Sequence, residues 1–310
     1  MYDDDTRKRR RLTKAVLLAA VPLAAAAALA GPLTGVFPGG PGGGGAGGAR
    51  GADGSPAPGA SGAPVASGAT GPGSAPSTRT GAAPLTGKVV VIDPGHNPGN
   101  FQHPAEISET VDVGTHRKEC DTTGTSTNAG YTEAAFTLDV SRRLRTVLQG
   151  KGATVEFTHD ADRPFGPCVD ERARIGNAAG GGRGADAVVS VHADGSAVGH
   201  RGHHVILPAL VKAGAADTAP IVGPSRTLGE RIQAAFARAT GSAPANYLGG
   251  GTGLHVRDDL GGLNLSTVPK VFVECGNMRD PDDAALLADP AWRQKAAQGI
   301  ADGISTYLLG

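Results

Sequence analysis

Three short, mostly apolar runs, each followed closely by a histidine or a glutamate, constrain the fold of this chain most. The runs and the residues that follow them are Val89–Ile92 with His96, Ala187–Val191 with His192, and Val271–Val273 with Glu274. Runs of this length and composition are typical of strands buried on both faces of a parallel sheet. Ligands gather at the carboxyl ends of the strands in open α/β sheets. We therefore expect these three side chains to lie close together at one edge of a sheet.

Helical patterns alternate with strands from residue 88 onward, which predicts one α/β domain with a mainly parallel sheet covered by helices. Two further strands are expected, at Ala153–Thr158 and Gly202–Leu207. The expected helices are Thr132–Gln149, with Thr132 as its cap, Asp170–Ala179, Ser225–Ala239 and Pro290–Leu308. The polar segment 97–130 is expected to be a long loop, and loops of that length in a compact domain are usually functional.

The first 85 residues differ in composition from the rest of the chain. A basic stretch at residues 7–14 precedes an uncharged Ala/Leu-rich run at 15–30, so residues 1–30 are predicted to be a signal peptide or, alternatively, an uncleaved N-terminal anchor. Residues 31–85 are rich in Gly, Ala, Pro and Ser and are expected to form a disordered linker, because they cannot bury enough apolar surface. The folded catalytic domain is then expected at 86–310.

The balance of charged side chains excludes nucleic-acid binding as a function. Without the six basic and three acidic side chains of residues 1–30, the 29 basic and 29 acidic side chains of the chain become 23 and 26. The exported part is therefore mildly acidic and has no basic stripe for nucleic acid. We expect no nucleic-acid partner.

The chain has three cysteines, which in an exported protein suggests one disulfide and one free thiol. Cys120 and Cys168 both lie in loop-like stretches, so these two are predicted to pair. Cys275 follows Glu274 at the end of an apolar strand and is interpreted as a buried small side chain rather than a nucleophile.

His96 and His192 are the expected metal ligands, because two imidazoles and a carboxylate with one open position are the composition of a catalytic zinc site. The third ligand is expected to be Glu133, at the start of a helix. Acidic residues are also favoured there by the helix dipole alone. Three other acids could take the third position instead, namely Glu109, Glu119 and Asp121.

Glu274 is expected to be the general base, since a carboxylate directly after an apolar strand is costly to desolvate unless it has a partner such as a metal-bound water. The alternative is a salt bridge with Arg257 or Arg279. Asp93 is expected to accept a hydrogen bond from a ligand histidine and to fix its tautomer. The group of His200, His203 and His204 is interpreted as polar surface, because adjacent strand residues point to opposite faces and cannot easily share one metal.

The motifs around these residues resemble those of the zinc-dependent N-acetylmuramoyl-L-alanine amidases of the amidase-3 type. They are Val-Val-Ile-Asp-Pro-Gly-His96, the helix-starting Glu133, Ser-Val-His192-Ala-Asp, and Val-Glu274-Cys-Gly-Asn-Met-Arg. The last string and Gly-Gly-Leu-Asn-Leu-Ser-Thr look most similar to the actinobacterial branch. The resemblance covers residues 86–308. The chain departs from many members in carrying Asp194 rather than Asn after the His-Ala pair.

The resemblance implies a six-stranded sheet flanked by helices and one Zn²⁺ per chain. It implies His96, Glu133 and His192 as zinc ligands and Glu274 as the catalytic acid and base. The substrate would be the amide joining N-acetylmuramic acid to L-alanine of the stem peptide. Further contacts to the ligands or the substrate are expected from Asp93, Arg257 and Asn277.

The expected partner is peptidoglycan or muropeptides, bound by a monomer located outside the cytoplasm, in the cell wall or tethered to the membrane. Contact with a membrane is expected only through an uncleaved N-terminal segment. Two rival functions stay open. One is a zinc peptidase that cuts within the stem peptide, and the other is a non-catalytic wall-binding or regulatory module on an amidase fold. The segment 97–130 is the one candidate for an obstruction of the site, although it is too rich in Gly and Thr for a stable blocking helix.

Overall fold

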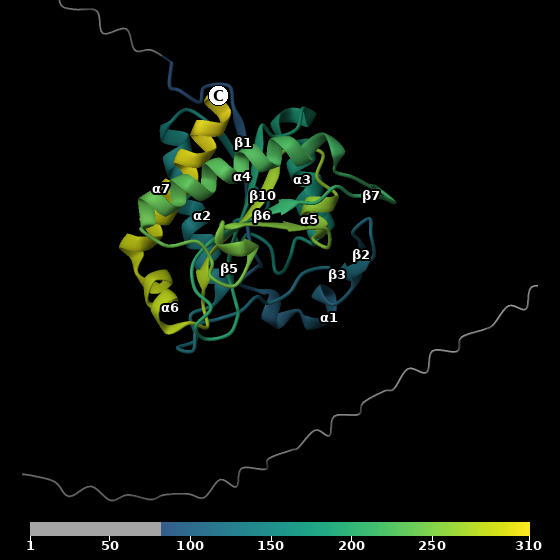
Figure 1. Cartoon of the computed structure of the whole chain (residues 1–310). Helices are drawn as coiled ribbons and strands as arrows, with labels where there is room; N and C mark the ends of the chain where they lie inside the picture. The colour runs from purple at the N-terminus through teal and green to yellow at the C-terminus, as the bar shows by residue number, and fades with distance from the viewer. Residues whose placement is uncertain (1–81) are drawn as a thin grey trace, which may run out of the picture. The chain divides into compact units, whose positions relative to one another are not determined.

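A computed structural model describes residues 82–310; the predicted signal or anchor and most of the predicted linker lie outside these residues. The centre is a six-stranded sheet in the order β4-β1-β5-β10-β6-β9 (Figure 1). Its strands are β1 Val89–Pro94, β4 Thr154–Phe157, β5 Ala187–Asp194, β6 His204–Pro208, β9 Leu254–Arg257 and β10 Lys270–Asn277. Neighbouring strands are parallel except β10 and β6. The predicted mainly parallel sheet is confirmed.

Five longer helices flank the sheet. They are α2 Glu133–Gly150, α3 Val169–Gly182, α4 Ala219–Thr240, α6 Pro281–Ala288 and α7 Pro290–Leu309. The smaller elements are η1 Asn100–Gln102, α1 Pro104–Ile107, β2 Thr110–Asp112, β3 Arg117–Glu119, β7 Lys212–Ala213, β8 Ala216–Asp217, η2 Gly249–Gly251 and α5 Gly261–Asn264. Among residues 82–310, no helix is long and apolar enough to cross a membrane.

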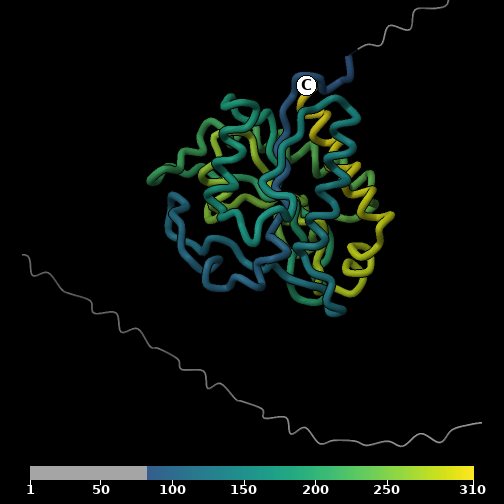
Figure 2. Tube along the Cα trace, turned by 180° about the vertical axis from the view of Figure 1, so that it is seen from behind, coloured from purple at the N-terminus to yellow at the C-terminus, as the bar shows by residue number. Residues whose placement is uncertain are grey.

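The main hydrophobic core lies between one face of the sheet and the helices α2, α4 and α7. Alternate strand residues such as Ile92 and Val189 point into it and meet Phe136 of α2, Phe236 of α4 and Ile300 of α7, all fully buried. The opposite face of the sheet is covered by α3 and α5 and has only a small apolar cluster near its amino-terminal end. The polar site can therefore occupy the remainder of that face and the strand ends beyond it. Figure 2 shows the same fold from behind.

The predicted helices are present with some changes of boundary. Thr132 caps α2, with its hydroxyl accepting from the amide of Ala135. Helix α4 begins at Ala219 instead of Ser225 and contains Pro224 within it. The early start is fixed by buried Thr218, whose hydroxyl accepts from the amide of Val211 and donates to the carbonyl of Ala209.

Strand β9 was not predicted. Its sequence Leu-His-Val-Arg lacks an apolar run because it forms an edge of the sheet and is only partly buried. The predicted loop 97–130 contains η1, α1 and the hairpin β2–β3. Its one α-helix has four residues, so no long blocking helix lies in this segment.

Candidate active site

The structure brings His96, Glu133 and His192 together at the carboxyl ends of the strands. His96 Nε2 lies 3.2 Å from Glu133 Oε2, and His192 Nδ1 lies 3.0 Å from Glu133 Oε1. One nitrogen from each histidine and one carboxylate oxygen all lie within 4.8 Å of one another. Their elements are far apart in sequence, so the order of the strands and the packing of α2 on the sheet place them side by side. The group has the donor set and the spacing to hold one metal ion.

His96 is held by an unusual backbone conformation. Its φ is +62°, in the left-handed region that non-glycine residues rarely adopt. The preceding Pro94-Gly95 turn leads the chain out of β1, and the ring then meets the carbonyl of Thr122 through Nδ1 at 3.0 Å. Burial alone would lower the pKa of His96, but the carboxylates of Glu133 and Asp121 outweigh it and raise the pKa to about 10.

Glu133 is the carboxylate between the two histidines and is 5% exposed. Its Oε1 accepts from the amide of Ala193, and its Oε2 accepts from the amide of Thr125. Burial alone would raise the pKa of Glu133, but His96 and His192 hold it below its usual range. Such a carboxylate is fixed in place and ionised, as a metal ligand has to be.

The competing acids occupy other positions. Glu109 and Glu119 are exposed. Asp121 is buried, and its Oδ1 lies 3.5 Å from His96 Nδ1, but its Oδ2 pairs with Arg172 at 2.8 Å. Asp121 therefore contacts the ring nitrogen of His96 that faces away from Glu133.

Glu274 lies next to this group, directly opposite His192 in the register of β10 and β5. Its Oε2 is buried and has no hydrogen-bond partner among residues 82–310. Burial, and then the charges of Glu133 and Asp194, raise its pKa well above the usual range. The salt bridge considered from the sequence is not present among the described residues: Arg257 pairs with Asp259, and Arg279 bonds the carbonyl of Ser126.

A pocket of about 210 Å³ opens over these groups. Its lining includes the three residues of the possible metal group together with Glu274, Arg257 and Phe272. The ring of Phe272 stacks on that of His192, with centroids 5.1 Å apart. A second cavity of about 150 Å³ lies beside it and is bounded by β3, α3 and α5. The site is thus open to a substrate on the side away from the core.

Asp93, Arg257 and Asn277, the other residues expected here, have different surroundings. Asp93 does not bond His96; it reaches His192 through the hydroxyl of Ser190. Arg257 lines the pocket. Asn277 does not line it, because its buried amide bonds the backbone of residues 196–200.

Asp194, the departure noted in the sequence, accepts a hydrogen bond of 2.7 Å from the hydroxyl of Tyr247. This tyrosine was not singled out from the sequence. It lies more than fifty positions along the chain, and no periodic pattern around it marked it as part of the site.

The interpretation of the histidine group as polar surface is wrong for two of its members. His203 is fully buried and His204 is 2% exposed. His203 faces the main core against Phe236, whereas His204 faces the site side opposite Glu274 in the register of β6 and β10. The expected opposite orientation holds, but the strand is central enough in the sheet to bury both rings.

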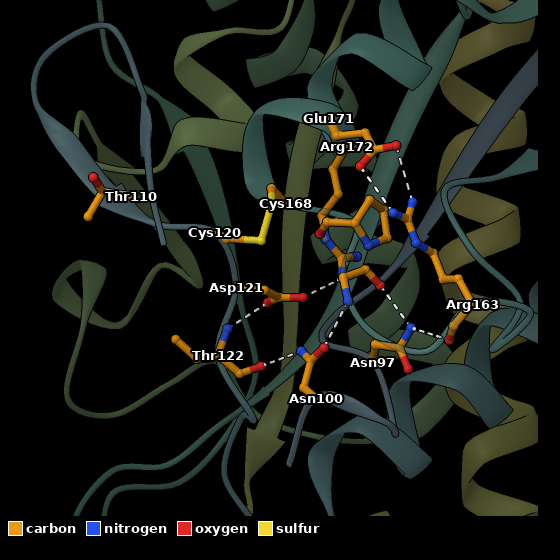
Figure 3. Close-up of a disulfide and its surroundings, with 12 residues drawn as sticks. Asn97, Asn100, Thr110, Cys120, Asp121, Thr122, Arg163, Cys168, Glu171 and Arg172 are labelled. Carbon is orange, nitrogen blue, oxygen red and sulfur yellow. Dashed lines mark hydrogen bonds and ion pairs between the residues drawn. A yellow bond between two sulfur atoms is a disulfide. The ribbon is translucent and has the colours of Figure 1, made fainter. Parts of the chain in front are cut away.

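Cys120 and Cys168 are joined by a disulfide, and Cys275 is free and buried. The bridge connects the segment directly after β3, which carries Asp121, to the N-cap position of α3, as Figure 3 shows. Asn100 fastens the same region, because its amide donates to the carbonyl of Thr122 and accepts from the amide of Gly166. The segment that covers one side of the site is therefore fixed to the domain by covalent and polar links.

The residues present fit a metal ion. His96 Nδ1 donates to a carbonyl, so Nε2 is the ring nitrogen available to a metal, and it faces the Glu133 carboxylate. A proton on Nε2 joins these two groups, in line with the raised pKa of His96, and a metal ion would take the place of that proton. The unpartnered oxygen of Glu274 adjoins the same space and is suited to accept a proton from a bound water.

Comparison with known proteins gives the family of the chain. The model of a family described as N-acetylmuramoyl-L-alanine amidase matches residues 90–306. An N-acetylmuramoyl-L-alanine amidase of Mycobacterium tuberculosis is 40% identical over 227 residues, which are 73% of this chain and 88% of the relative. Among solved structures, the amidase Ami1 of Mycobacterium smegmatis matches with a TM-score of 0.65 and 39% identity, over 72% of this chain and 98% of that one. The apo form of Ami1 from Mycobacterium abscessus matches with a TM-score of 0.63 and 38% identity, over 72% of this chain and all of that one.

Proposed function

The chain belongs to the amidase-3 family of N-acetylmuramoyl-L-alanine amidases, and we propose that His96, Glu133 and His192 hold one zinc ion in it while Glu274 moves the proton. The enzyme is a peptidoglycan amidase that cleaves the amide between N-acetylmuramic acid and L-alanine of the stem peptide.

The observation that carries the proposal is the unpartnered, buried Oε2 of Glu274 beside the His-Glu-His group. Zinc in such a site polarises the carbonyl under attack and lowers the pKa of a bound water toward roughly 7. No cation among residues 82–310 pairs with Glu274, and its raised pKa gives the carboxylate a high affinity for the proton of the attacking water. The same carboxyl group then returns the proton to the departing amine of L-alanine.

The surrounding residues orient and enclose the reaction. The amides of Ala193 and Thr125 fix both oxygens of Glu133, so the carboxylate cannot rotate toward Glu274. Phe272 covers one face of His192 and limits its rotation. Arg257, at the rim of the pocket, is the cation best placed to contact an anionic group of the substrate.

We also propose that residues 1–30 direct export and that 31–85 tether the catalytic domain at 86–310. The Cys120–Cys168 disulfide supports a location outside the cytoplasm, because such bridges persist in oxidising compartments. The domain is proposed to act as a monomer, with any membrane contact made by the N-terminal segment alone.

Digestion of purified peptidoglycan tests the assignment. The full-length chain, stripped of metal and then given one equivalent of zinc, is expected to release peptides that begin with free L-alanine, identified by mass spectrometry. New termini within the stem peptide would instead indicate the rival zinc peptidase. Binding to peptidoglycan without any new terminus would favour the non-catalytic module.

A further inference from the structure

Four charged side chains form a buried cluster on the α3 side of the sheet, beneath the site. Arg172 of α3 donates to Asp93 Oδ1 at 2.7 Å and to Asp121 Oδ2 at 2.8 Å. Lys270 Nζ lies 3.1 Å from Asp93 Oδ2. The exposed fractions are 1% for Asp93 and Lys270, 5% for Arg172 and 7% for Asp121. Burial of ions costs several kcal/mol for each, and a buried pair is weak evidence for stability alone.

One branch of this cluster leads to His192. The hydroxyl of Ser190 lies 2.9 Å from Asp93 Oδ2 and 3.1 Å from His192 Nε2. Asp93 is paired with two cations, so it stays an ionised acceptor, and its backbone carbonyl, 3.3 Å from the same hydroxyl, also only accepts. The single hydroxyl hydrogen therefore goes to Asp93. Ser190 has only its lone pairs left for His192, so His192 carries its hydrogen on Nε2 and presents a lone pair on Nδ1.

The other branch leads to His96. Asp121, held through Oδ2 by Arg172, accepts the amide hydrogen of Thr122 on Oδ1 at 2.8 Å. This contact fixes the segment whose carbonyl, that of Thr122, accepts from His96 Nδ1. His96 therefore keeps the hydrogen on Nδ1, and Nε2 is the nitrogen left to bind a metal.

The two branches select different ring nitrogens, Nε2 in His96 and Nδ1 in His192, and in both rings the selected nitrogen faces Glu133. His96 offers Nε2 and His192 offers Nδ1, and these are the nitrogens that lie 3.2 and 3.0 Å from the Glu133 carboxylate. Each histidine thus faces the metal position with the nitrogen that its other hydrogen bonds leave available. Partners of this kind commonly contribute 10–100-fold to metal affinity.

We propose that Arg172 is a positioning residue which, through Asp93 with Ser190 and through Asp121, fixes the ring nitrogen that each ligand histidine presents to the metal. The inference rests on the proposed zinc ligands. Arg172 suits this role because its guanidinium is always charged and planar and can bond two carboxylates at once. The guanidinium also donates to the carbonyls of Pro94 and Pro167, and these two bonds hold it in one orientation.

The disulfide supports the same arrangement. Cys120 precedes Asp121, and Cys168 stands four residues before Arg172 at the start of α3. The amide of Val169 also bonds the carbonyl of Cys120 at 2.8 Å. Figure 3 shows Arg172 and Asp121 pointing toward each other beside the bridge. The two halves of this branch are therefore held together by a covalent bond next to the ion pair.

The test compares the zinc dissociation constants of full-length variants, measured by competition with a chromophoric chelator. Arg172→Lys keeps the charge but replaces the two terminal nitrogens, one of which bonds Asp93 and the other Asp121, with a single nitrogen; it is expected to raise the constant by roughly 10–100-fold. Ser190→Ala leaves the four charges in place and removes only the link to His192, and a rise of about 10-fold is expected. The matched control is Arg163→Lys, which alters a bidentate pair with Glu171 on the same helix without touching the cluster.

Nitrogen NMR of the histidine side chains in the zinc-loaded chain gives a readout that a general loss of stability would not change. Zinc is expected on Nδ1 of His192 and on Nε2 of His96. Ser190→Ala is expected to disturb the pattern at His192 alone, and Arg172→Lys the pattern at both rings.

Unchanged dissociation constants in both variants, or zinc on the other nitrogen of either ring, would overturn the role of Arg172 and leave the proposed function standing. Absence of zinc binding by the unsubstituted chain would overturn the proposed function and this inference with it. If Arg172→Lys does not fold, the constant and the NMR pattern of Ser190→Ala decide alone.

Discussion

Glu274 on β10 lies directly opposite His192 on β5, so the proposed base and a proposed metal ligand are neighbours on one face of the sheet. Residues that are paired across parallel strands project to the same side. The position of the proposed base is therefore set by the backbone register and not by a flexible loop. A site on strands is held more rigidly than one on loops.

Glu274→Gln tests the role of this carboxylate. The amide keeps the shape but cannot accept a proton, so kcat is expected to fall by roughly 10²–10⁴-fold. Zinc content is expected to stay at that of the unsubstituted chain, because Glu274 is not among the grouped donors. The measurements are release of L-alanine termini and bound zinc. Exposed Glu109→Gln serves as the control, and turnover retained in Glu274→Gln would refute the assignment.

Removal of zinc is expected to lower thermal stability. A ligand that binds only the folded state at about 1,000 times its dissociation constant stabilises by about 4 kcal/mol. For a domain of this size that corresponds to a change of roughly 10 °C in Tm. The measurement is the melting temperature of the metal-free chain with and without added zinc. His192→Ala should show no such rise, and an equal rise in that variant would place the zinc elsewhere.

The pH dependence of stability should report on buried His204. Burial lowers its pKa to about 4; the carboxylate of Asp194 opposes this change, and nearby His255, His203 and Arg257 each add a smaller lowering effect. The unfolded chain takes up this proton near pH 6.5 and the folded chain only near pH 4. Stability from this group is therefore complete above pH 6.5 and is lost as pH falls toward 4, by on the order of 3 kcal/mol.

His204→Leu removes this group and should flatten the change in unfolding free energy between pH 7 and pH 4.5. The difference in unfolding free energy between the two pH values is unaffected by any loss of stability that the substitution causes equally at both. His116, exposed on the β2–β3 hairpin, gives the control His116→Gln, which should keep the full pH dependence. An undiminished dependence in His204→Leu would contradict the prediction.

The parts of the fold that the sequence predicts are those with strong local patterns. The buried strands that lead to His96, His192 and Glu274 are continuous apolar runs, and α2 has both a cap and a periodic face. Strand β9 could not be found in this way, because an edge strand needs no apolar run. His204 was placed at the surface because its neighbours along the chain do not reveal how central β6 lies in the sheet.

The partners of Asp93 could not be predicted from the sequence, because they lie far from it along the chain. Arg172, Ser190 and Lys270 lie 79, 97 and 177 positions from it. Lys270, at the start of the apolar strand β10, was the one local signal that this part of the sheet holds a buried charge in need of a partner. Identifying the partner required the order of the strands in the sheet.

Loss of the disulfide is expected to destabilise the domain. The bridge joins residues 48 positions apart, and the double variant Cys120→Ser with Cys168→Ser should lose about 2–4 kcal/mol of unfolding free energy in chemical denaturation. When the unsubstituted chain is unfolded in denaturant and alkylated, its intact mass should show one modified thiol without reductant and three with reductant. Cys275→Ala keeps the bridge and is the control. Modified thiols at 120 and 168 without reductant would show that no bridge forms.

Gly95→Ala should damage the metal site while the fold is kept. A Cβ at this position would lie 2.3–2.7 Å from three atoms of the His192 ring. The backbone cannot withdraw, because the amide of Gly95 bonds the carbonyl of Val191 at 2.9 Å. The ring of His192 must therefore turn, which removes its Nδ1 from the Glu133 carboxylate.

The expected result is a rise of the zinc dissociation constant by roughly 10–100-fold, as for the loss of a contact that orients a ligand. The metal-free domain should lose only about 1–3 kcal/mol, the usual cost of overpacking. Gly150→Ala, where the added methyl group meets nothing within 4 Å, is the matched control. Chelator competition and denaturation of the metal-free chain separate the two effects. Equal zinc affinity in Gly95→Ala and the unsubstituted chain would mean that His192 does not hold the metal in the orientation described.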